Sequence, residues 1–92
     1  MSPGRNTAYR RVEGIPAQEI DGQAVIVMPS RREIHELDEV GTFIWKRLER
    51  ACSLDDLASA VCDAFEVSRE RALKDARAFV GDLEKKGLVS RR

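Results

Sequence analysis

The fold is decided by residues 19–45, which read EIDGQAVIVMPSRREIHELDEVGTFIW. Asp21-Gly22 predicts a tight hairpin turn, because glycine takes a positive φ without steric penalty. The run from Ala24 to Met28 is apolar and rich in β-branched residues, which is typical of a central strand with both faces covered. Pro29-Ser30 predicts a second turn directly after it. This stretch therefore predicts antiparallel strands joined by short turns.

Two less apolar strands flank the central one within a strand region that spans residues 9–37. Residues 17–20 form the strand before the first turn, and Arg32 to Leu37 form the strand after the second. Alternation in the later strand places Arg32, Ile34 and Glu36 on one face and Glu33, His35 and Leu37 on the other. A strand with so many charges suits the edge of a sheet.

The remainder of the chain predicts three helices. Asp38, Ser53 and Ser68 are the expected N-caps, and Asp56, three residues after Ser53, gives a pattern close to a capping box. Gly87 is expected to end the last helix in a left-handed conformation. Apolar residues recur every three or four positions in each helix: Val40, Phe43, Ile44, Trp45 and Leu48 in the first, Leu54, Leu57, Ala58, Val61, Cys62 and Phe65 in the second, and Ala72, Leu73, Ala76, Phe79, Val80 and Leu83 in the third.

Three strands followed by three helices predict an α+β fold with a three-stranded antiparallel sheet and a winged-helix-like arrangement. The chain has 92 residues, which suits one domain. We expect that domain over residues 9–92, after a flexible tail of residues 1–8. The start of the chain has no apolar run of the kind found in signal peptides, so a cytoplasmic location is expected.

The sequence offers little material for catalysis, a metal or a cofactor. Two cysteines and one histidine fall short of the four ligands of a structural zinc site. The glycines form no phosphate-binding pattern. His35 lies among acidic residues and is expected to be structural, and both cysteines are expected to be reduced thiols. We therefore expect a binding module that is not an enzyme and uses no cofactor.

Two features could bind a partner. An edge strand over residues 32–37 leaves backbone N–H and C=O groups free to pair with an added peptide strand. The border of the third helix carries Leu73 and Val80 beside Arg77 and Glu70, which could form one wall of a groove. Two simpler interpretations stay open: the edge is only protected by its charges, and Leu73 and Val80 are core residues.

The chain resembles the PqqD family, whose members are also called RiPP recognition elements after the ribosomally made, post-translationally modified peptides that they serve. Leu37-Asp38 corresponds to the family's Leu-Asn, and VGTFIW at residues 40–45 and FVGDLEKKGLV at residues 79–89 match its pattern. The resemblance covers residues 17–89. It departs from the family at Asp38, in place of asparagine, and at Ala51-Cys52, where the family often has Asp-Gly.

The resemblance implies a peptide chaperone. Such a protein binds the leader segment of a precursor peptide as an added strand and presents it to a modifying enzyme, typically a radical SAM enzyme in pyrroloquinoline quinone biosynthesis. Other members serve lasso-peptide pathways. Together with the edge strand and the helix border, this places the expected peptide-binding site on eight residues: Arg32, Glu33, Ile34, His35, Glu36, Leu73, Arg77 and Val80.

Alternative functions remain open at this point. A winged-helix DNA-binding regulator could use Arg69, Arg71, Lys74 and Arg77, although sixteen basic and sixteen acidic residues leave no net charge to attract nucleic acid. A module that only joins two proteins is the other alternative. No membrane partner is expected, and self-pairing of the edge strand into a homodimer is left open.

Overall fold

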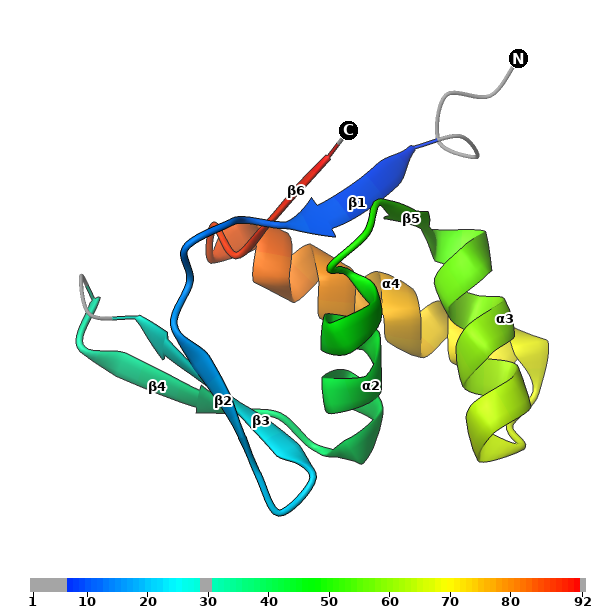
Figure 1. Cartoon of the computed structure of the whole chain (residues 1–92). Helices are drawn as coiled ribbons and strands as arrows, with labels where there is room; N and C mark the ends of the chain where they lie inside the picture. Colours follow the sequence, from blue (N-terminus) through cyan, green and yellow to red (C-terminus); the bar gives the residue numbers. More distant parts are fainter. Residues whose placement is uncertain (1–6, 29–30, 92) are drawn as a thin grey trace.

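The computed structural model describes residues 7–28 and 31–91, so the expected turn at Pro29-Ser30 and most of the expected tail lie outside the described residues. Within these ranges the chain forms two three-stranded antiparallel sheets and three helices (Figure 1). The elements are β1 (Ala8–Arg11), β2 (Ala17–Ile20), β3 (Gln23–Met28), β4 (Glu33–Glu36), α2 (Glu39–Arg47), β5 (Cys52–Ser53), α3 (Leu54–Phe65), α4 (Arg69–Lys85) and β6 (Val89–Arg91). The predicted α+β class is confirmed.

The predicted sheet is present in the order β2-β3-β4. Ile20 pairs with Gln23 across the hairpin turn, in which Asp21 has a φ of 51° and Gly22 a φ of 82°. Two consecutive positive φ angles define a type I′ turn, whose twist matches that of the strands it joins. The sheet lies on one side of α2, and α3 lies on the other (Figure 1).

The central strand β3 is covered on one face only, which corrects the expectation that both faces are covered. Ala24, Ile26 and Met28 are buried, whereas Val25 and Val27 between them are half-exposed. Val27 pairs with Ile34 of β4, which is 67% exposed. The helices pack against one face of this sheet, so the other face carries apolar side chains that meet solvent.

The second sheet, in the order β5-β1-β6, was not predicted. β1 reads AYRR, β6 has three residues and β5 has two, so none of them carries a clear strand pattern. The pairing joins Tyr9 to Cys52 on one side and to Arg91 on the other. Such long-range contacts depend on the packed helices that bring the segments together, and short windows of sequence do not contain them.

The predicted helix ends are confirmed. The Asp38 carboxylate accepts a hydrogen bond from the Gly41 N–H at 2.7 Å. Ser53 and Asp56 form the reciprocal capping box, and Ser68 caps α4. Gly87 has a φ of 76°, with the Leu88 N–H donating to the Leu83 carbonyl at 2.9 Å. These bonds satisfy backbone groups that every helix end leaves unpaired.

Thr42 is the buried polar residue that ties the first sheet to α2. It is 4% exposed, and its Oγ1 accepts a hydrogen bond from the Ala24 N–H of β3 at 2.8 Å. The same hydroxyl lies 3.5 Å from the carbonyl of Leu37, the residue that directly follows β4. One hydroxyl therefore links α2 to both β3 and the segment that follows β4.

Replacing Thr42 by valine is expected to lower the free energy of unfolding by about 1–3 kcal/mol, because the buried Ala24 N–H loses its acceptor. Chemical denaturation measures this loss, and amide hydrogen exchange should show faster exchange at Ala24. The control is Thr42→Ser, which keeps the acceptor and should keep Ala24 protected. Equal exchange at Ala24 in the valine and serine variants would contradict the assignment.

Candidate functional site

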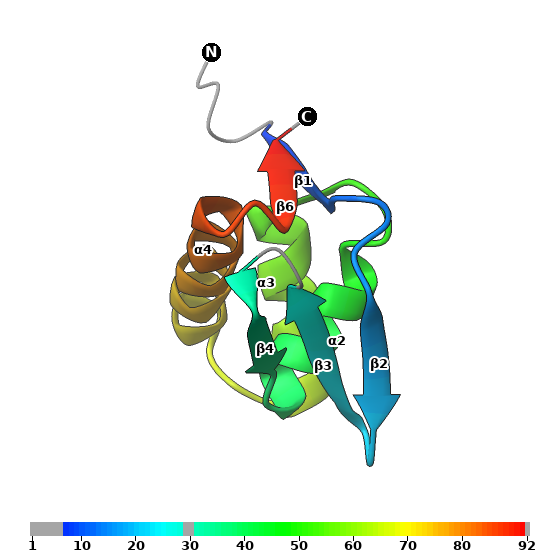
Figure 2. The same cartoon turned by 90° about the vertical axis from the view of Figure 1, so that its left-hand side faces the viewer.

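Strand β4 is an open edge of its sheet in the described part of the chain, where β3 is its one pairing partner. Figure 2 shows β4 at the border on the side of α4, with β2 at the far border. The Leu37 N–H donates to the Ala24 carbonyl at 2.8 Å, so Leu37 directs its backbone groups toward β3. Successive residues of a strand direct these groups to opposite sides. The N–H and C=O groups of Ile34 and Glu36 therefore face the open edge.

The side chains of β4 alternate as predicted. His35 pairs with the buried Ile26 and is half-buried, whereas Ile34 and Glu36 project from the other face and are exposed. The strand is shorter than predicted, because Arg32 has a φ of 54° and cannot continue it. Arg32 therefore lies just before β4, and Leu37 lies just after it with 9% exposure. The regular strand available for pairing therefore begins at Glu33.

His35 lies on the inward face of β4, and its ring is partly enclosed. Its Nε2 lies 3.6 Å from Glu33 Oε1, beyond hydrogen-bond distance, and this buried atom has no hydrogen-bond partner among the described residues. Among the described residues, no group of three His, Cys, Asp or Glu side chains is placed to hold a metal ion. A structural role for His35 stays a prediction.

The three predicted helix residues lie along one side of α4. Val80 is 1% exposed and belongs to the core, Leu73 is half-buried against that core, and Arg77 is exposed. An α-helix turns by about 100° per residue, which places Arg69 and Glu84 on the same side. Arg69 contacts Ser59 of α3 at 2.6 Å, and Glu84 contacts Arg91 of β6 at 2.7 Å. This side of α4 therefore faces α3 and β6.

The opposite border of α4 lies nearer to β4, and Phe79 marks it. A Cβ placed on Gly41 would lie 3.0 Å from Phe79 Cε1 and 3.5 Å from the Leu37 Cβ. The ring of Phe79 thus lies against the start of α2, where the chain leaves β4. Phe79 belongs to the predicted apolar stripe of this helix, and it is half-buried. Both borders of the apolar stripe are alike in sequence, so the pattern could not select between them.

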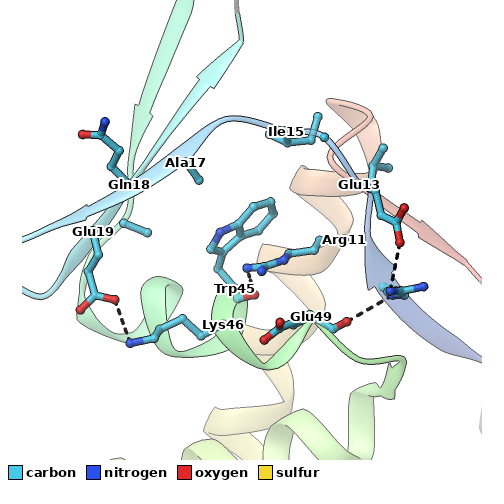
Figure 3. A pocket seen from close by; sticks show the side chains of 13 residues that line it. Arg11, Glu13, Ile15, Ala17, Gln18, Glu19, Trp45, Lys46 and Glu49 are labelled. Atoms are coloured by element: carbon cyan, nitrogen blue, oxygen red, sulfur yellow. Dashed lines mark hydrogen bonds and ion pairs between the residues drawn. The ribbon is translucent and has the colours of Figure 1, made fainter.

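A cavity of about 460 Å³ opens at the other edge of the sheet, between α2 and the segment that joins β1 to β2 (Figure 3). The Arg11 guanidinium lies 5.1 Å from the centre of the Trp45 ring, and Lys46 Nζ lies 2.8 Å from Glu19 Oε1. Arg10 bonds to the Glu49 carbonyl at 3.2 Å. Three basic and three acidic side chains line this cavity, and none of the eight predicted site residues does.

The two cysteines are free thiols, as expected. Burial raises the pKa of the Cys52 thiol, with a further increase from Asp56 and an opposing effect of Arg47. A raised pKa keeps the thiol protonated near neutral pH and makes it a weak nucleophile. The Cys62 Sγ donates to the Val67 carbonyl at 2.9 Å. The thiol thus contacts the backbone of the segment that follows α3.

The basic residues of α4 are partly neutralised. Arg69 lies 3.5 Å from Asp55 Oδ1, and Arg71 lies 3.2 Å from Asp75 Oδ2. Lys74 and Arg77 are exposed. Two of the four cations that a DNA-binding role would use therefore already have acidic neighbours. No helix in the described ranges is long and apolar enough to cross a membrane.

Comparison with solved structures finds the same fold in proteins described with bound peptides. A lasso peptide synthetase B1 complexed with the leader peptide matches with a TM-score of 0.77 and 26% identity, over 89% of this chain and 96% of the other. TbiB1 in complex with the TbiA(beta) leader peptide matches with a TM-score of 0.78 and 26% identity, over 88% and 94%.

A third structure shares the fold at lower identity. It is the PqqD truncation of Methylobacterium extorquens PqqCD, described as a functional and stand-alone RiPP recognition element, with a TM-score of 0.73 and 13% identity over 90% of this chain and 88% of the other. No curated protein matches the chain. The model of a protein family, described as coenzyme PQQ synthesis protein D (PqqD), matches residues 23–89. That match spans most of the chain, from β3 through α4, and this protein therefore belongs to the PqqD family.

Proposed function

We propose that this protein binds the leader segment of a ribosomally made precursor peptide as a strand added to β4, and that it presents the precursor to a modifying enzyme. The observation that carries the proposal is the open edge of β4, where the backbone groups of Ile34 and Glu36 have no strand partner in the described chain. Two structural neighbours with this fold are described with a leader peptide bound. Strand addition uses backbone bonds for affinity and side-chain contacts for specificity.

The strand part of the predicted site keeps its place in this proposal. Glu33 and His35 would face the helix side of the added strand, and Ile34 and Glu36 would face solvent beside it. For the helix part, we propose Phe79 as the contact nearest to the leader, because its ring lies where β4 ends. Leu73, Arg77 and Val80 lie on the side of α4 that faces α3 and β6. Their role in binding stays a prediction.

The proposed role is binding and not catalysis. The modifying enzyme would supply the reaction, and a radical SAM enzyme is the class that we propose. This chain would contribute affinity for the leader and a fixed orientation of the precursor. It needs no cofactor for either task.

The test is an amide-shift titration by NMR with synthetic leader segments of precursors encoded beside this gene, and with duplex DNA as the control. Leader binding should shift the amides of residues 31–37 and of Phe79. A spectrum unchanged by every leader, together with DNA-induced shifts at Arg69, Arg71 and Lys74, would overturn the proposal and favour a DNA-binding regulator. In the control titration, binding to DNA through its phosphates would weaken steeply as the salt concentration rises.

A further inference from the structure

The side chains along the exposed edge of β4 are ordered so that an antiparallel copy can meet each of them with a complementary group. Along residues 32–36 the side chains are basic, acidic, apolar, imidazole and acidic. Ile34 is 67% exposed, and Arg32, Glu33 and Glu36 are exposed as well. A symmetric pair of strands places each residue opposite a fixed partner, so the register decides whether these groups attract or repel.

Backbone geometry restricts the register of such a pair. Two residues that lie opposite each other in an antiparallel pair direct their backbone N–H and C=O groups either both toward the partner strand or both away from it. Ile34 and Glu36 face the open edge, whereas Glu33 and His35 face β3, as the bond from Leu37 to Ala24 establishes. A symmetric pair must therefore have a single residue at its two-fold axis, which excludes the register that would set Glu33 opposite Glu36.

Among the allowed registers, the one centred on Ile34 matches every charge with a suitable partner. Ile34 then lies opposite Ile34 of the second copy, and the two residues exchange both backbone hydrogen bonds. Glu33 lies opposite the copy's His35, and Arg32, which directly precedes β4, lies beside the copy's Glu36. Centring on Glu33 or Glu36 would set two carboxylates face to face, and centring on His35 would set Ile34 opposite Glu36.

The apolar face of the sheet gives this register a second source of stability. Val27 lies beside Ile34 on the outward face. Pairing through Ile34 would extend that row across the two-fold axis into the Ile34 and Val27 of the copy. The exposed apolar surface of each Ile34 is thereby partly removed from water, which favours association.

We propose that two copies of this protein pair through β4, in an antiparallel register centred on Ile34, and that a bound leader displaces the second copy. The second part rests on the proposed function, because the leader and the copy would use the same backbone groups. The dimer keeps the open edge covered until a leader arrives. The contact is small, so the dimer is expected to be weak and to exchange readily.

Sedimentation equilibrium from about 10 μM to about 1 mM protein tests the dimer, a range that covers weak association. Glu36→Lys sets the new lysine beside Arg32 of the copy, and Arg32→Glu sets the new glutamate beside Glu36. Each variant alone should dimerise at least tenfold more weakly than the unchanged protein. An equimolar mixture of the two should recover a heterodimer, because each lysine then meets a glutamate and each Arg32 meets a Glu36.

Asp63→Lys is the matched control, since Asp63 is exposed on α3 and the charge change is the same as in Glu36→Lys. It should leave dimerisation unchanged. A protein that stays monomeric at the highest concentration, or single variants that dimerise as before, would overturn the dimer.

The leader titration separates this inference from the proposed function. If the leader shifts the β4 amides of a protein that is monomeric at every concentration, the proposed function is supported and the proposed dimer is contradicted. A dimer that persists with saturating leader would leave the dimer standing and argue against leader binding at β4. Leader-induced dissociation supports both.

Discussion

Replacing Ile34 by proline should weaken leader binding by about 10- to 100-fold, the range expected when an added strand loses a backbone donor and its own acceptor is left unpaired. The Ile34 N–H faces the open edge, so its removal breaks no bond to β3. Proline is tolerated at edge strands where the missing N–H would face solvent. The folded structure should therefore survive the change. Isothermal titration calorimetry with a leader peptide measures the loss.

Two controls separate the backbone effect from side-chain and general effects. Ile34→Ala removes the exposed side chain but keeps the N–H, and it should cost less affinity than the proline. Ala17→Pro places the same ring on β2, where alternation from the bond between Val27 and the Pro16 carbonyl directs Ala17 toward the opposite edge. That variant should bind the leader normally. If Ala17→Pro and Ile34→Pro lowered affinity equally, β4 would not be the docking edge.

The part of the fold that depends on local sequence was predicted well. Asp21-Gly22 determines the hairpin because few dipeptides adopt two positive φ angles, and the caps at Asp38, Ser53 and Ser68 follow from side chains that bond to nearby amides. The alternation in β4 was also correct, since period-two patterns follow from strand geometry alone. These features need no knowledge of distant residues.

Features that depend on contacts between distant segments were not predicted. β1 becomes a strand because it lies between β5 and β6, and its own residues do not specify this. β3 looks like a strand buried on both faces, yet its outward residues meet solvent in the described chain. A second copy or a partner that covers the row of Val27 and Ile34 would explain why these outward residues are apolar.

The helix side of the site illustrates the same limit. The apolar stripe of α4 has two borders, and Leu73 and Arg77 lie on one while Phe79 lies near the other. Only the packing of α4 on α3, recorded in the contact of Arg69 with Ser59, shows which border turns away from β4. The sequence contained the correct helix and the correct stripe, but the rotation of the helix about its axis is a tertiary property.

The second large effect concerns stability and should leave the proposed binding edge untouched. Trp45→Ala is expected to lower the free energy of unfolding by about 3–5 kcal/mol, because truncation of a buried aromatic residue loses its packing and leaves a cavity. Trp45 is 3% exposed within the core, and the Arg11 guanidinium covers its ring. The free energy of unfolding of such a domain is roughly 5–15 kcal/mol, so this loss is a large part of it. Since each kcal/mol lowers the Tm of a domain of this size by about 4 °C or more, the Tm should fall by at least about 12 °C.

Lys46→Ala is the control for that change, since Lys46 is exposed and its ion pair with Glu19 should contribute less than about 1 kcal/mol. Trp45→Phe should recover part of the stability lost in the alanine variant and should bind the leader as the unchanged protein does, because the ring lies beside the cavity at the β2 edge. A loss below about 1 kcal/mol for Trp45→Ala would mean that the ring is not a core residue. A selective loss of leader affinity in stable Trp45→Phe would instead move the docking site from β4 to that cavity.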